Sequence, residues 1–109
     1  MAESGETNME RYEYIKWFWK HEDDRFPILL FYEIDLESGR YAARILEVYA
    51  DRRAVPVIEE GFEFITEAPI PPVDEINTEP EFFAQVISKE EFEAAYVCDK
   101  YTEEIAFPK

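Results

Sequence analysis

Hydrophobic and polar residues alternate with a period of two where the patterned part of the chain begins. In residues 12–21, Ile15, Trp17 and Trp19 fall on one side of this pattern, and lysines flank Phe18 on the other. A period of two is that of a β-strand, whose successive side chains point to opposite faces. We therefore predict a strand here, with the tryptophan face inward.

Four further runs predict strands that follow one another closely. Residues 28–35 and 40–49 are separated by a Glu-Ser-Gly turn sequence, so we expect them to pair as a hairpin. Residues 54–58 contain Pro56, which has no N–H for a neighbouring strand and is therefore tolerated at a sheet edge. A weaker alternation in residues 62–67 predicts a fifth strand.

The chain then changes from strand patterns to a helix. Three prolines in residues 68–72 prevent a regular element and indicate an extended crossover, after which one helical turn is expected over residues 72–76. Ser88 and Glu91 form a capping box, in which the serine hydroxyl accepts from the glutamate amide and the carboxylate reaches back to the serine amide. The helix that follows is predicted to run to about Val97.

These elements predict an α+β fold, with an antiparallel sheet of four to five strands and one C-terminal helix packed on a face. The apolar stripe of that helix consists of Phe92, Ala95 and Tyr96. The chain divides into a flexible N-terminal tail, a single α+β domain and a C-terminal tail, at residues 1–11, 12–97 and 98–109. In the last of these, Ile105 and Phe107 are expected to pack.

Apolar side chains point to both faces of the first two strands, whereas one helix covers only one face. Phe18, Leu29 and Phe31 lie on the second face. Large exposed apolar patches on monomers commonly mark contacts, so these three residues are candidates for an interaction with another protein or with a second copy. The alternative is that the proline-rich crossover or the C-terminal tail covers this face.

The charge of the chain is negative and unevenly distributed. Of 109 residues, 26 are acidic and 11 basic, for a net charge of −15, and residues 54–109 hold 14 of the acids and 3 of the bases, a net −11. Such a field repels nucleic acids and anionic membranes and attracts basic proteins. The candidate contact residues in this half are Glu59, Glu60, Glu63 and Glu67.

The residue types that carry most enzyme chemistry are scarce. His21 and Cys98 are the sole histidine and cysteine, and they lie far apart in the sequence, which gives no sign of a nucleophile beside its base. The spacing of ligands typical of zinc or calcium sites is missing, as is a glycine-rich phosphate loop. We therefore predict no catalytic residue, no metal and no cofactor, although 26 acids leave a carboxylate pair possible.

The sequence also bears on location. A single cysteine forms no internal disulfide, and the first residues lack the basic and apolar regions of a signal peptide. Apolar runs fall short of the roughly 20 residues that cross a bilayer. We expect a cytoplasmic protein without membrane or nucleic-acid contacts.

A family resemblance emerges from ordered short matches across residues 12–97. The matching segments are Tyr14-Ile15-Lys16-Trp17 with His21, Pro27 to Ile34, Tyr41 with Arg44, Glu47-Val48-Tyr49, Pro69-Ile70-Pro71, Glu75-Ile76-Asn77, Glu81-Phe82 and Ile87 to Glu93. In these the chain resembles a family of small uncharacterised bacterial domains, a domain of unknown function. The resemblance implies a compact bacterial domain and supplies no catalytic residues.

Three hypotheses about function follow. The leading one is a non-catalytic acidic protein-binding domain, such as an immunity or antitoxin-like protein that neutralises a basic partner. The second is a binder of a small ligand, for example a sugar, or a hydrolase, which uses carboxylates and aromatic rings in a concave pocket. The third is a homodimer joined through the Phe18, Leu29 and Phe31 face. The oligomeric state is thus expected to be monomer or homodimer.

Overall fold

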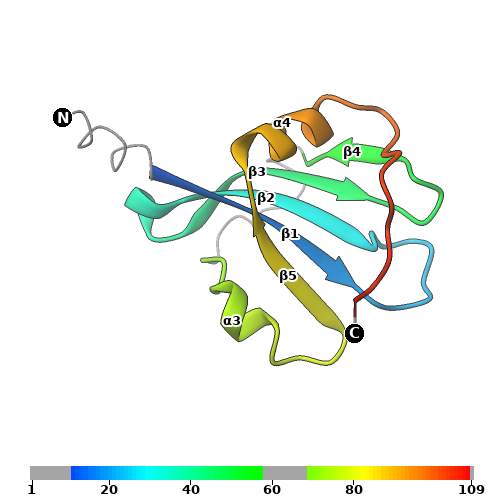
Figure 1. Cartoon of the computed structure of the whole chain (residues 1–109), viewed down its shortest axis with the longest axis horizontal. Helices are drawn as coiled ribbons and strands as arrows, with labels where there is room; N and C mark the ends of the chain where they lie inside the picture. The colour runs from blue at the N-terminus through cyan, green and yellow to red at the C-terminus, as the bar shows by residue number, and fades with distance from the viewer. Residues whose placement is uncertain (1–10, 58–68, 109) are drawn as a thin grey trace.

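The computed structural model describes residues 11–57 and 69–108, which form one antiparallel sheet and two short α-helices (Figure 1). The strands are β1 (Tyr12–Trp19), β2 (Leu29–Asp35), β3 (Tyr41–Val48), β4 (Ala54–Pro56) and β5 (Phe82–Ile87), and the helices are α3 (Val73–Ile76) and α4 (Lys89–Tyr96). The strands lie in the order β4-β3-β2-β1-β5. The predicted α+β fold with a five-stranded antiparallel sheet is confirmed.

The predicted hairpin is confirmed as β2 and β3, joined by the 3-10 turn η2 (Leu36–Ser38). Asp35 caps this turn, because its carboxylate accepts from the Glu37 amide at 3.0 Å. Gly39 closes it with φ of 79°, a left-handed conformation that costs glycine little. The turn sequence therefore sets the register of the two strands.

The strand that contains Pro56 lies at one edge of the sheet, as predicted, and is shorter than expected. The chain after α4 covers this edge: the Ala54 amide donates to Asp99 O at 3.0 Å, and the Tyr101 amide donates to Arg52 O at 2.9 Å. The C-terminal tail thus begins as an extension of the sheet.

The strand at the opposite edge, β5, was not predicted from the sequence. It pairs antiparallel with β1, so that Trp17 stands opposite Ala84 and Phe18 opposite Phe83. The strand predicted in residues 62–67 lies outside the described residues. Two adjacent phenylalanines followed by alanine obscure the alternation of β5, and its pairing partner is some 65 residues away in sequence.

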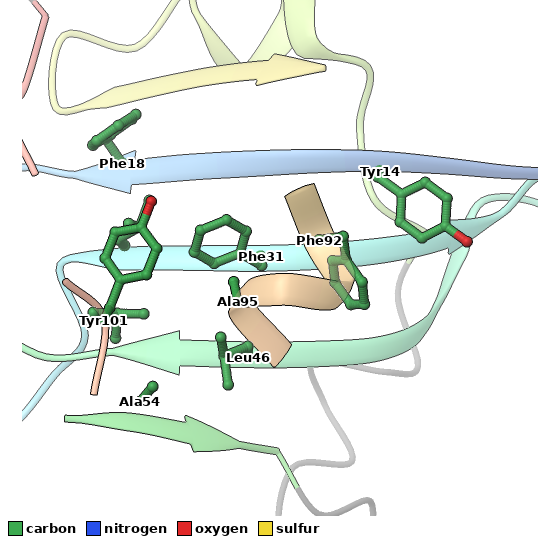
Figure 2. Close-up of a cluster of buried hydrophobic side chains, with 10 residues drawn as sticks. Tyr14, Phe18, Phe31, Leu46, Ala54, Phe92, Ala95 and Tyr101 are labelled. Carbon is green, nitrogen blue, oxygen red and sulfur yellow. The ribbon is translucent and has the colours of Figure 1, made fainter. Parts of the chain in front are cut away.

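One face of the sheet buries a cluster beneath α4 and the tail (Figure 2). Phe92 and Ala95 of α4 share this cluster with Phe18, Phe31 and Tyr101, and Ile105 and Phe107 pack at its margin as expected. The cluster residues on the strands are Tyr14, Phe18, Leu29, Phe31, Leu46, Val48 and Ala54.

This burial corrects the prediction of an exposed docking face. Phe18 is 6% exposed, and Leu29 and Phe31 are fully buried by the chain itself. Because α4 and Tyr101 already cover these side chains, they form no exposed apolar patch for another protein or a second copy. Of the three, only Phe18 reaches the lining of a cavity. The alternative of self-coverage by the tail holds instead.

The other face carries a second cluster, covered by the crossover and α3. Ile70 and Ile76 pack there against Ile15, Leu30 and other strand residues, which are Tyr32, Ile34, Ile45 and Ala84. The predicted inward position of Ile15 is confirmed, whereas Trp17 and Trp19 are half-buried. Both faces of β1 are therefore used, which explains its mixture of aromatic and aliphatic residues.

The capping box is confirmed in its first half. The Ser88 hydroxyl accepts from the Glu91 amide at 3.0 Å and begins α4, which ends at Val97. The Glu91 carboxylate accepts from Lys16 Nζ at 3.1 Å rather than reaching back to the Ser88 amide. This ion pair joins the first turn of α4 to β1.

Candidate functional site

A partly buried ionic network links the sheet to α4, and the pKa values of several of its groups are shifted. Arg44 donates two hydrogen bonds to Glu33, at 2.8 and 2.9 Å, and one to Glu93 at 2.7 Å. The Tyr14 hydroxyl donates to the same Glu33 carboxylate at 2.8 Å. Because every charged group in it has an opposite partner, this network has the character of a structural connection.

The pKa shifts in this network keep its carboxyl groups ionised and its tyrosine hydroxyl protonated. Hydrogen bonds from Arg44 hold the pKa of Glu33 below its ordinary value, and the same guanidinium lowers the pKa of Glu93. Burial, followed by the bond to Glu33, raises the pKa of Tyr14 to about 12. Carboxyl groups with lowered pKa stay ionised near neutral pH, which is the opposite of what a general acid requires.

The two residues considered for nucleophilic catalysis take part in local structure. His21 Nδ1 accepts from the Asp23 amide at 3.0 Å, and His21 Nε2 lies 2.8 Å from Pro27 O, so the ring orders the loop between β1 and β2. The Cys98 thiol donates to Ala95 O, 3.0 Å away, after the end of α4. Across residues 11–57 and 69–108, no group of three histidine, cysteine or acidic side chains is arranged to hold a metal ion.

A stretch without basic residues passes along the β5 edge of the molecule. The stretch from residue 54 to 88 contains eight acids and no lysine or arginine. Its four described acids lie in residues 69–88, which form α3 and β5, side by side in Figure 1. Asp74, Glu75, Glu79 and Glu81 are exposed there and are called the acidic side below.

The basic side chains are mostly neutralised elsewhere. Those that lie within 3.1 Å of a carboxylate oxygen are Arg11, Lys16, Arg25, Arg40 and Arg44. In the described part of the chain, no ion pair reaches Asp74, Glu75 or Glu81. The predicted contact residues Glu59, Glu60, Glu63 and Glu67 belong to the same acidic stretch but lie outside the described residues.

The outer edge of β5 is partly occupied by the chain itself. The Asn77 side chain accepts from the Ala84 amide at 2.6 Å and donates to Ala84 O at 3.0 Å, as a neighbouring strand would. The Phe82 amide donates to Glu79 O at 3.2 Å. These bonds limit strand addition at an edge that would otherwise be open to it.

A cavity of about 570 Å³ lies between α4, the end of β1 and the C-terminal tail. Phe18, Ala95 and Tyr101 contribute to its lining, together with charged side chains from all three elements. Its size falls within the range of small-ligand sites. Tyr101 was not singled out from the sequence, because a tyrosine in a charged tail gives no periodic signal of burial.

None of the described helices is both long and apolar enough to cross a membrane. In comparisons with known proteins, the model of a family described as a domain of unknown function (DUF6881) matches residues 13–100. No curated protein and no solved structure matches the chain. Since the match covers most of the sequence, the chain belongs to this family, as the resemblance implied.

Proposed function

We propose that this chain is a non-catalytic binding domain that docks a basic protein on its acidic side. The observation that carries the proposal is the one-sided charge: residues 54–88 have eight acids and no base. Their described acids are exposed on α3 and beside β5. A surface of one sign steers an oppositely charged protein and raises its association rate, an effect that weakens as salt is added.

The rest of the molecule is consistent with docking through charge rather than through an apolar patch. Both sheet faces bury their hydrophobic clusters within the chain, and Phe18, Leu29 and Phe31 are covered. The carboxyl groups with shifted pKa, which are Asp23, Glu33, Asp35 and Glu93, are all shifted downward. A hydrolase would favour at least one carboxyl group with a raised pKa.

An immunity or antitoxin-like role in a bacterial cytoplasm fits this chemistry. Acidic inhibitors of basic enzymes act by covering a positively charged cleft, where electrostatic steering and ion pairs both favour the complex. The lone Cys98 favours a reducing compartment. The role, the bacterial origin and the location are parts of the proposal.

The experiment is a pull-down from the native host at low and moderate salt, with three forms of this chain as bait. One is the wild type, and one carries Asp74→Asn, Glu75→Gln and Glu81→Gln, which remove three charges from the acidic side. The matched control carries Glu22→Gln, Asp24→Asn and Glu37→Gln, which remove three exposed charges from loops elsewhere.

We expect a basic protein to be retained by the wild type and the control at low salt, and to be lost from the acidic-side variant. Retention should also fall as the salt concentration rises. Recovery of anionic proteins alone, or equal retention by all three baits, would contradict the proposal.

A further inference from the structure

The cavity beside α4 is built from three separate elements. Phe18 lies at the end of β1, Ala95 on α4 and Tyr101 in the tail, and all three contribute to the lining of the cavity. Figure 2 shows the Tyr101 side chain reaching from the tail towards the end of β1. Each is at most 6% exposed. The cavity therefore has a floor of three buried residues below a rim of exposed or half-buried side chains, most of them charged or small.

A polar group in this floor has no partner. Tyr101 as a whole residue is 5% exposed, and its hydroxyl makes no hydrogen bond within residues 11–57 and 69–108. Because Tyr101 Oη is not one of the buried side-chain atoms without a partner in these residues, the hydroxyl oxygen is open to the cavity. Figure 2 shows this hydroxyl pointing towards β1, on the side of Phe18. Burial and the nearby Glu91 and Glu103 raise its pKa, so the hydroxyl is neutral and accepts or donates one bond.

The charged lining of the cavity favours a cation. It contains Lys16 and Lys100 against Glu91, Glu103 and Glu104, which leaves one negative charge in excess. Lys16 Nζ occupies one oxygen of Glu91 at 3.1 Å, so the second oxygen is available to another donor. The same lysine lies 5.8 Å from the centre of the Phe18 ring, which places a cation against this aromatic floor.

We propose that the cavity receives the guanidinium group of an arginine from the basic partner. A guanidinium presents several N–H donors in a plane, which suits the acceptors Tyr101 Oη and Glu91 together with the aromatic rings below them. A lysine ammonium lacks this planar shape and gains less from stacking. The inference rests on the proposed function, because the arginine belongs to the same basic protein. That protein must then extend from α3 across the β5 edge to the α4 face of the sheet.

The experiment measures binding of two basic peptides of equal length and charge, one with arginines and one with lysines, by titration calorimetry at low salt. N-acetyl-arginine methylamide serves as a small probe of the guanidinium alone. The chain is tested as wild type, as Tyr101→Phe, which keeps the ring but removes the hydroxyl, and as Ala94→Trp, which fills the cavity from an exposed helix position. Amide NMR spectra check that each variant is folded and locate the bound peptide.

We expect the arginine peptide to bind the wild type more tightly than the lysine peptide does. Tyr101→Phe should weaken the affinity for the arginine peptide by roughly threefold to tenfold, as expected for the loss of one hydrogen bond. Its affinity for the lysine peptide should stay nearly unchanged. Ala94→Trp should abolish the preference between the two peptides. The amide shifts caused by the arginine peptide should include Tyr101 and Thr102.

Three results would overturn the inference, and they separate its failure from that of the proposed function. Equal affinity of both peptides for wild type and Ala94→Trp would show charge-driven docking without use of the cavity. Equal affinity of the small probe and the arginine peptide would identify a free guanidinium compound rather than a protein side chain as the occupant. Absence of binding by either peptide at low salt would contradict the proposed function and the inference together.

Discussion

Arg44 connects the middle of the sheet to α4 through carboxylates on two elements. Its guanidinium is bonded to Glu33 and Glu93 and lies 4.9 Å from the centres of the Phe92 and Tyr96 rings. Such a guanidinium contributes stacking as well as ion pairing, so lysine would not replace it. At the scale of single residues, this network determines where α4 sits and therefore shapes one wall of the cavity.

The stability contributed by Glu33 should depend on pH. Arg44 holds the pKa of Glu33 below its ordinary value in the folded protein, so the unfolded chain binds the proton more tightly. The stabilisation is therefore fully present above the ordinary pKa of about 4.3 and is lost as pH falls through the lower folded value. We expect Glu33→Gln to reduce the free energy of unfolding by about 1–3 kcal/mol near pH 7, and by less near pH 3.

Urea unfolding at both pH values measures this difference, and Glu37→Gln is the matched control. The Glu37 side chain is 67% exposed, so its change should stay within about 0.5 kcal/mol at either pH. A Glu33→Gln variant whose loss of stability is the same at both pH values would show that the pKa shift has no energetic consequence.

At the scale of elements, α4 depends on its first turn. The eight-residue helix begins at Ser88, whose hydroxyl accepts from the Glu91 amide. Short helices are only marginally stable on their own, so the loss of a cap lowers the stability of the whole domain. We expect Ser88→Ala to cost about 1 kcal/mol in urea unfolding, and Ser88→Asp, which keeps an acceptor, to cost much less. Equal losses of stability in Ser88→Ala and Ser88→Asp would show that the cap is not the source of the effect.

The β5 edge depends on one side chain from the turn after α3. Asn77 makes both hydrogen bonds to the outer side of Ala84. We expect Asn77→Ala to lower the free energy of unfolding by about 1–3 kcal/mol and to promote self-association, because it exposes unpaired backbone groups at a sheet edge. Unfolding and sedimentation velocity at several concentrations test this, with the exposed Gln85→Ala as control. A stable, monomeric Asn77→Ala variant would contradict it.

The elements also differ in how far their sequences reveal them. Clean alternation and a glycine turn made β1, β2 and β3 predictable, since those signals are local. The strand β5 was missed because its pattern begins with two adjacent phenylalanines and its stability comes from pairing with β1, far away in the chain. Strand propensity depends on such context more than helix propensity does.

At the scale of the whole molecule, burial of the second face could not be read from the sequence. Phe18, Leu29 and Phe31 share their strand faces with charged residues such as Lys16 and Glu33, a pattern that fits either an exposed patch or a covered core. The tail decides between them, because Tyr101 and Ile105 pack on this cluster. The candidate cavity was equally hidden, since it joins β1, α4 and the tail, which are distant in sequence.

The distribution of charge, by contrast, was visible from the start. A stretch without lysine or arginine stays negative in any fold, and its four described acids lie along α3 and beside β5. Among the residues that the structure describes, no ion pair reaches Asp74, Glu75 or Glu81 on this side. For the molecule as a whole, our proposal is that the resulting field selects a basic partner.

The most direct test of the account is the association rate of the basic partner, measured by stopped flow between low and moderate salt. For the wild type and the variant lacking charges at Glu22, Asp24 and Glu37, we predict a rate that falls steeply with added salt. For the acidic-side variant, the rate should be at least several-fold lower at low salt and depend only weakly on salt. The same rate and salt dependence for all three proteins would contradict docking on the acidic side.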